Sequence, residues 1–176
     1  MSTKQLITSC AAYNVNANQQ FVTWLQKQSH DQLLKEVSSS FNAILKTLNH
    51  IWAIEEMWCA DLFKNKDAVN RYGIEDLNPQ EVFDGLLKRS SIIAEKVSQL
   101  TEEQLNEVVN IKTPWFEANL HLCEYLQHLF NHRTYHRGQI ITQAHALGFT
   151  EMPSTDFLFY EIANQTNNNI IKIKYA

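Results

Sequence analysis

Glycine and proline are scarce in this sequence, with 4 glycines and 3 prolines among 176 residues. An all-β fold needs many tight turns, and these two residues supply most of them, so the composition argues against that class. No apolar run approaches the roughly 20 residues that cross a bilayer. The first residues also lack the basic and apolar segments of a secretion signal. We therefore expect a cytoplasmic protein without a membrane partner.

An excess of basic charge is also missing, because the net charge is -4 and the isoelectric point is near 6.0. A nucleic-acid partner is therefore not expected. The 3 cysteines are scattered and odd in number, which does not fit a disulfide framework. We expect Cys10, Cys59 and Cys123 to be buried reduced thiols.

Long amphipathic segments are what the sequence does contain. Apolar residues recur at three- and four-residue steps, which is the period of a helix buried on one face. The segments cover approximately residues 3–28, 39–63, 79–100 and 118–147. Ser39 or Ser40 is expected to cap the second helix, and Asn78 to precede Pro79 at the start of the third. These segments predict an all-α, up-and-down four-helix bundle in a single domain over residues 1–176.

Shorter segments complete the chain. Residues 108–116 have strand character and are interrupted by a proline, so we expect an extended connection or a small hairpin. A short extra helix near the C-terminus is expected over residues 154–162, with Ser154, Thr155 or Asp156 as its cap. The last segment, 164–176, is expected to be frayed or to pair as an edge strand.

Two histidines four residues apart, His132 and His136, lie in the run "HLFNHRTYHRGQI". On a helix they share one face, and here that face is the apolar one. Burying two imidazoles without partners is costly, so something must satisfy them. A metal ion bound by both neutral rings does so; a pair of hydrogen-bonded histidines is an equally open reading.

A third ligand is needed, and His50 is the candidate. It lies in "LKTLNHIWAIEEMW", on a stripe of apolar or small residues that predicts an inward-facing side chain. The alternative is a core histidine with ordinary hydrogen bonds. His128, one turn before His132, is a competing ligand that we expect to lie at the rim. Three neutral histidines leave a coordination position open, as in catalytic zinc sites, although nickel, iron or copper also suits imidazole ligands.

Several segments together resemble the DinB-like (damage-inducible, YfiT-like) superfamily. They are "YNVNANQQF", "LNHIWAIEEMW", "HLFNHRTYHRGQI" and "PSTDFLFY", in the family's order and over nearly the whole chain. The resemblance implies a four-helix bundle, a homodimer, and a divalent metal held by His50, His132 and His136. The family includes transferases and isomerases that use low-molecular-weight thiols such as bacillithiol, mycothiol or glutathione.

Three functions remain open at this point. The first is a metal-dependent transferase that joins a low-molecular-weight thiol to an electrophilic small molecule. The second is a metal-dependent hydrolase that uses bound hydroxide. The third is a non-catalytic metal-binding protein of the stress response.

Polar residues near the histidines allow more than one role. Arg137 can pair with an acid or meet an anionic substrate, and Gly138 is expected to allow close approach of a neighbouring helix. Asn14 and Asn18 share one helix face and are expected at a packing seam or beside the metal ligands. Glu55 and Glu56 are candidates for a general base or a ligand-orienting group, with at least one expected at the solvated surface. The tryptophans are expected in the core or a pocket wall: Trp24, Trp52, Trp58 and Trp115.

Overall fold

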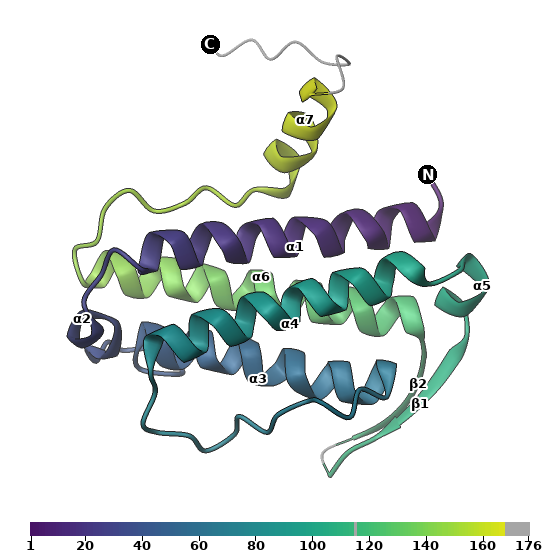
Figure 1. The fold of residues 1–176 in the computed structure, drawn as a ribbon, viewed down its shortest axis with the longest axis horizontal. Helices are drawn as coiled ribbons and strands as arrows, with labels where there is room; N and C mark the ends of the chain where they lie inside the picture. Colours follow the sequence, from purple (N-terminus) through teal and green to yellow (C-terminus); the bar gives the residue numbers. More distant parts are fainter. Residues whose placement is uncertain (115, 168–176) are drawn as a thin grey trace.

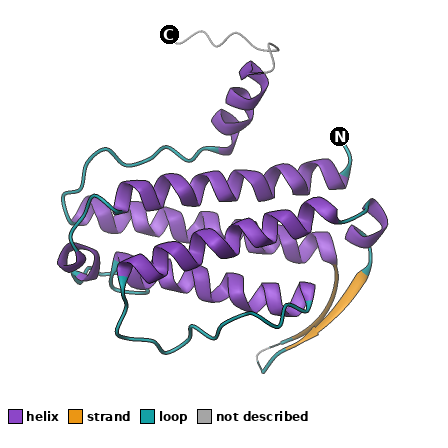
Figure 2. Ribbon diagram, viewed as in Figure 1, coloured by secondary structure: helices purple, strands orange, loops and turns teal. Residues whose placement is uncertain are grey.

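A computed structural model describes residues 1–114 and 116–167 of the chain, and helices dominate it (Figures 1 and 2). The long helices are α1 (Thr3–Leu25), α3 (Ile44–Phe63), α4 (Pro79–Gln99) and α6 (Leu122–Ala146). The shorter elements are α2 (His30–Leu34), α5 (Glu102–Leu105), β1 (Val108–Lys112), β2 (Glu117–His121) and α7 (Phe157–Asn167). The four long helices pack side by side, which confirms the predicted helical bundle.

Polar side chains define where most helices begin. Three helices begin with a capping box, at Ser2, Ser29 and Thr101. In each, the hydroxyl of the cap residue accepts a hydrogen bond from the backbone N–H three residues later, and the glutamine side chain at that position accepts one from the backbone N–H of the cap residue. Asn78 caps α4, and Pro79 occupies its first turn as predicted. Asp156 accepts a hydrogen bond from the Leu158 N–H at the start of α7.

The predicted starts of the second and the fourth long helix are wrong. The second long helix begins at Ile44, and its preceding residue Ala43 makes no side-chain cap. Ser39 and Ser40 instead precede a turn at Asn42, whose φ of 43° is tolerated by asparagine and whose carbonyl accepts from Val37.

The fourth long helix begins later than predicted because residues 117–121 are a strand. They pair antiparallel with residues 108–112, from Val108 opposite His121 to Lys112 opposite Glu117. This pairing confirms the small hairpin that was one of the two alternatives. His121 is therefore the residue before α6 and not part of its helical face.

Helices α3 and α4 run in the same direction, so simple up-and-down alternation does not hold for this pair (Figure 1). Residues 64–78 return along α3: Val69 N–H donates to Glu56, and Arg71 donates to Asn49 nearer the start of α3. The next helix then begins beside the start of α3. Fifteen residues of connection make this reversal possible, and their polar sequence predicted a loop but not its path.

Buried apolar side chains form two clusters along the bundle. One contains Phe21, Trp52 and Phe83, and the other contains Trp58 and Phe130. On each long helix, buried polar residues lie in sequence between members of the two clusters. They include Asn14, Asn18, Glu55, Ser90, Arg133 and Arg137. The bundle therefore contains a polar layer between two apolar ones.

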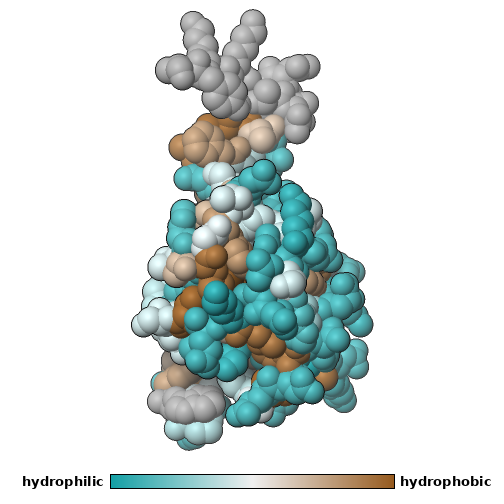
Figure 3. Space-filling model, turned by 90° about the vertical axis from the view of Figure 1, so that its left-hand side faces the viewer, coloured by the Kyte–Doolittle hydropathy of each residue, from teal (hydrophilic) through white to brown (hydrophobic). Residues whose placement is uncertain are grey.

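The C-terminal part leaves the bundle and carries α7 above α1 (Figure 1). Tyr13 of α1 meets the rings of Phe157 and Tyr160 edge-on. Leu158 and Phe159 are exposed on α7, and apolar residues also show there in Figure 3, which views the end of the bundle near α2. Residues 164–167, predicted to be frayed or to form an edge strand, instead complete α7, which ends at Asn167. The rest of that predicted segment, residues 168–176, and Trp115 lie outside the described residues. Among the described helices, none is long and apolar enough to span a membrane.

Candidate metal centre

Three histidines from two helices meet at one point. His50 comes from α3, and His132 and His136 come from successive turns of α6. Nε2 of His132 lies 3.2 Å from Nε2 of His50 and 3.0 Å from Nε2 of His136. One ligand atom from each ring lies within 4.8 Å of the others. The structure thus brings together the three residues that the sequence singled out.

The tautomer of His136 is defined by Gln139. Nδ1 of His136 lies 2.7 Å from Oε1 of Gln139, an acceptor, so the ring proton resides on Nδ1. Its Nε2 therefore carries a lone pair toward the other two rings. A second hydrogen bond that orients a ligating imidazole in this way is a common feature of metal sites. Gln139 was not predicted as part of the site, although its position three residues after His136 is the signal that could have revealed it.

The three rings are held neutral. Burial lowers the pKa of His50 to about 4, with a contribution from His136, and lowers that of His132 to about 3, with contributions from the neighbouring histidines. Burial also lowers the pKa of His136, against the opposing effect of Gln139. A neutral imidazole, which offers a nitrogen lone pair, is the form of histidine that binds a divalent metal.

Aromatic side chains surround the histidines. Phe41 stacks on His50 at 4.2 Å between ring centroids and meets His136 edge-on. Tyr135, which is exposed, also meets His136 edge-on at 5.0 Å. Their packing restricts ring rotation. His50 and His132 are half-buried, whereas His136 is buried.

His128 lies at the rim, as the sequence predicted. Its side chain is exposed, and its ring lies 6.2 Å from that of His132 and 5.5 Å from that of Trp58. The closely spaced ligand set contains His50, His132 and His136 without it. His30 is the exposed first residue of α2, consistent with its predicted solvation.

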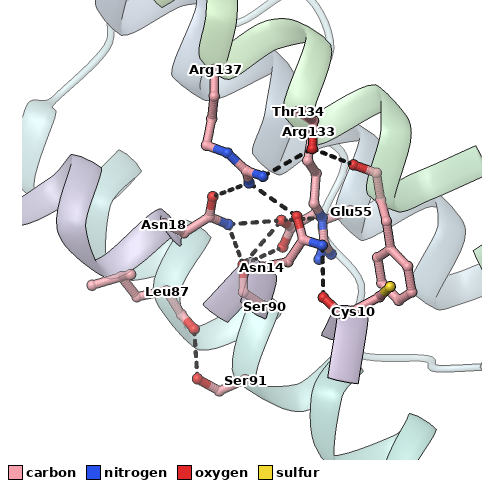
Figure 4. Close-up of polar contacts among 11 residues, drawn as sticks. Cys10, Asn14, Asn18, Glu55, Leu87, Ser90, Ser91, Arg133, Thr134 and Arg137 are labelled. Carbon is pink, nitrogen blue, oxygen red and sulfur yellow. Dashed lines mark hydrogen bonds and ion pairs between the residues drawn. The ribbon is translucent and has the colours of Figure 1, made fainter. Parts of the chain in front are cut away.

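A buried carboxylate lies behind the histidines, at the centre of Figure 4. Glu55 pairs with Arg133 at 2.8 Å and accepts hydrogen bonds from Ser90 at 2.9 and 3.0 Å. Asn18 also donates to it, at 3.3 Å. Burial raises the pKa of Glu55, while Arg133 and these hydrogen bonds oppose the increase. Arg133 directly follows His132, so this pair anchors the turn of α6 that carries a histidine.

Arg137 occupies the same polar layer (Figure 4). It donates to Asn14 at 3.0 Å and to Asn18 at 3.2 Å, so both asparagines are buried partners of α6. It also donates to Thr134 at 3.1 Å and to Tyr13 at 3.4 Å. The structure thus places Arg137 in a hydrogen-bonded network between α1 and α6.

Both glutamates are buried, so the expectation that at least one is solvated is wrong. Glu56 pairs with Arg89 at 2.7 Å and accepts from the Trp52 indole at 2.6 Å. The reason is that α4 packs along the side of α3 that carries Glu56. A helical period alone does not show that two neighbouring faces of α3 are covered.

Only Cys59 of the three cysteines is fully buried, and all three are free thiols.

The predicted role of Gly138 is also wrong. A Cβ at this position would meet nothing within 4 Å apart from its own helix and neighbours. Gly85 instead provides close helix contact, because a Cβ there would overlap the ring of Trp52. Gly138 lies on the outer side of α6, where it borders a small cavity with residues 37–39.

The donor set fits a divalent metal ion. Three imidazole nitrogen atoms suit zinc, nickel, iron or copper, and three protein ligands leave positions for water or a second ligand. The neutral rings and the orienting Gln139 meet two further requirements of such a site. The fold and this cluster define the chain as a helical-bundle protein with a three-histidine site able to hold a metal.

Comparison with known proteins assigns the family. Residues 1–169 match the DinB family, so the chain belongs to it. Protein DinB of Bacillus subtilis (strain 168) is 29% identical over 163 residues, which cover 88% of this chain and 92% of that protein. The uncharacterized protein YizA of the same organism is 28% identical over 137 residues, covering 77% of this chain and 84% of the other. The resemblance found in the sequence is confirmed.

Proposed function

We propose that this protein is a divalent-metal-dependent enzyme that transfers a low-molecular-weight thiol to an electrophilic small molecule. The observation that carries the proposal is the meeting of three neutral histidine side chains, two of them only half-buried, with ligand atoms within 4.8 Å of one another. A divalent ion bound there supplies a Lewis acid that lowers the pKa of a coordinated thiol or water.

The side chains of the protein serve this chemistry in distinct ways. Gln139 keeps the proton of His136 on Nδ1, away from the ligand position. Phe41 and Tyr135 pack against the rings and limit access of water. Behind the site, Arg133 and Arg137 place two cationic groups beside the single carboxylate of Glu55. This excess of positive charge favours an anionic ligand such as a thiolate.

The choice of thiol transfer rests on the resemblance to a superfamily that contains such transferases. Hydrolysis is the competing enzymatic function, because the same ion equally activates water. A site without turnover would correspond to a metal-binding protein of the stress response. The three functions differ in the reactants that they require, so a single series of measurements separates them.

The test begins with elemental analysis of the untagged protein and its His50→Ala, His132→Ala and His136→Ala variants. About one divalent metal per chain is expected in the wild type, with loss in each variant. His145→Ala is the matched control, because this exposed histidine lies on α6 away from the cluster.

Conjugation of glutathione or bacillithiol to monochlorobimane then measures the reaction. Wild-type activity and its loss in His136→Ala would support thiol transfer. Unchanged activity in that variant would contradict the proposal. Turnover of esters or amides without thiol would assign a hydrolase, and a fully loaded protein without either activity would assign a binding protein.

A further inference from the structure

A cavity of about 430 Å³ lies along α3, between this helix, residues 68–72 and the hairpin turn. Its volume is within the range of small-molecule sites. Ala53 and Met57 form part of its floor, three and seven residues after His50 on α3. Residues three apart on a helix are neighbours, with Cβ atoms about 5–6 Å from each other. The cavity therefore begins one helical turn beyond a proposed metal ligand.

Small and apolar side chains create this space. Ala53, Ala60 and Ala68 line the cavity, and their methyl groups leave room that larger residues would fill. Met57 and the exposed Val69 add flexible apolar surface. Thioether side chains adapt to ligands of irregular shape. The lining thus favours a mainly apolar ligand.

The charged groups of the cavity are engaged or unfavourable to anions. The Glu56 carboxylate pairs with Arg89 and accepts from Trp52 and Val69. Lys112 pairs with Glu117 at 2.8 Å. Asp61 adds a carboxylate to the lining. The lining carries one cation, Lys112, against the carboxylates of Glu56 and Asp61, so it favours a neutral ligand over an anionic one.

One polar group is suited to orient such a ligand. The Tyr72 hydroxyl donates a hydrogen bond to Met57 Sδ at 3.8 Å, and it has no second acceptor among the residues that the structure describes. A thioether is a weak acceptor, so a carbonyl or similar oxygen of a ligand would compete effectively for this hydroxyl. A mainly apolar lining with a small number of polar groups is typical of sites that bind small organic molecules.

We propose that this cavity binds the apolar part of the electrophile, next to the thiol activated at the three histidines. The inference rests on the proposed function only in naming the ligand as the electrophile. The cavity as a site for neutral apolar molecules stands on its lining and position. Thiol and electrophile would then occupy adjacent positions along α3.

Fluorescence titration with the neutral apolar probe N-phenyl-1-naphthylamine tests the cavity directly, with metal-free protein and without thiol. Saturable binding at one site per chain is expected. Ala60→Leu on α3 and Ala68→Leu in the loop that follows it each add bulk to the cavity lining and should each raise Kd at least about tenfold. Ala146→Leu is the matched control, because Ala146 lines a different cavity, the one bordered by Gly138 and residues 37–39. This variant should leave Kd unchanged.

Circular dichroism melting curves verify that the leucine variants fold. Absence of saturable probe binding, or unchanged Kd in both variants, would overturn the inference. Where conjugation occurs, KM for monochlorobimane should rise in Ala60→Leu and Ala68→Leu while metal content stays at the wild-type level. Probe binding without any conjugation would overturn the proposed thiol transfer and leave the apolar site supported.

Discussion

Gln139 and His136 are joined by a hydrogen bond of 2.7 Å that points the free lone pair of the imidazole toward its two neighbouring histidines. Both residues lie on α6, three positions apart, so one helical turn carries a proposed ligand together with the group that orients it. The geometry of His136 is therefore determined locally, before α3 contributes His50.

Removing this orienting group should weaken metal binding without removing a ligand. We expect Gln139→Ala to lower metal affinity by about 10- to 100-fold, because His136 loses its preferred tautomer and ring orientation. Competition with a chromogenic chelator measures the affinity. Gln127→Ala is the control, since this exposed glutamine on the same helix binds Asn131 and not a histidine. Equal affinities in the two variants would show that Gln139 has no orienting role.

The metal-free protein should lose stability as the pH falls below about 6.5. The pKa values of His50 and His132 are lowered to about 4 and about 3, whereas unfolded histidine titrates near 6.5. Between these values the unfolded chain binds more protons, so acidification favours unfolding. The stabilising effect of the neutral rings is complete above the unfolded pKa and is lost as the pH falls through the folded values.

Urea denaturation of the metal-free protein between about pH 7 and pH 5 measures this dependence. His132→Gln should show a shallower decline in the unfolding midpoint, because one titrating group with a lowered pKa is gone. His145→Gln should follow the wild type. An identical pH dependence in His132→Gln and wild type would refute the assignment to this ring.

The buried pair of Arg133 and Glu55 should be far more sensitive to truncation than a surface pair. Arg133→Met leaves a fully buried carboxylate without its cation, which we expect to lower the free energy of unfolding by about 3–5 kcal/mol. Lys112→Met breaks an exposed pair with Glu117 and should cost less than about 1 kcal/mol. Urea denaturation at neutral pH compares them, and similar small losses would contradict the structural role of Arg133.

The two helical glycines should respond oppositely to alanine. Gly138→Ala adds a methyl group that would meet no other atom within 4 Å, its own helix and chain neighbours aside. We expect stabilisation of about 0.5–1 kcal/mol, because alanine has the better helix propensity. Gly85→Ala places the same group against the Trp52 ring, and we expect a loss of about 1–3 kcal/mol from overpacking. Thermal melting curves of both variants provide the comparison, and the same sign of change in both would be inconsistent with the packing described.

The sequence predicted the features that depend on local periodicity. The long helices, the Asn78 cap and the inward faces of His50, His132 and His136 all follow from residue spacing along one helix. The family resemblance connected His50 with the other two, because helical period alone does not state which helices are neighbours.

Features that depend on packing between helices were less accessible. Glu56 is buried because α4 runs beside α3, and that arrangement follows from the return path of residues 64–78. Gly138 and Gly85 look alike in the sequence and differ only in what faces them. Arg133 was missed because a charged residue on a helix usually faces solvent, and its partner Glu55 lies on another helix.

The distance in sequence between the two helices of the metal centre has a consequence for folding. His50 and His132 are separated by 82 positions. An ion that bridges them closes a long loop of chain, in the manner of a disulfide cross-link, and excludes many extended conformations of the unfolded state. Because such an ion binds the folded chain preferentially, its free concentration would also govern how much of the protein remains folded.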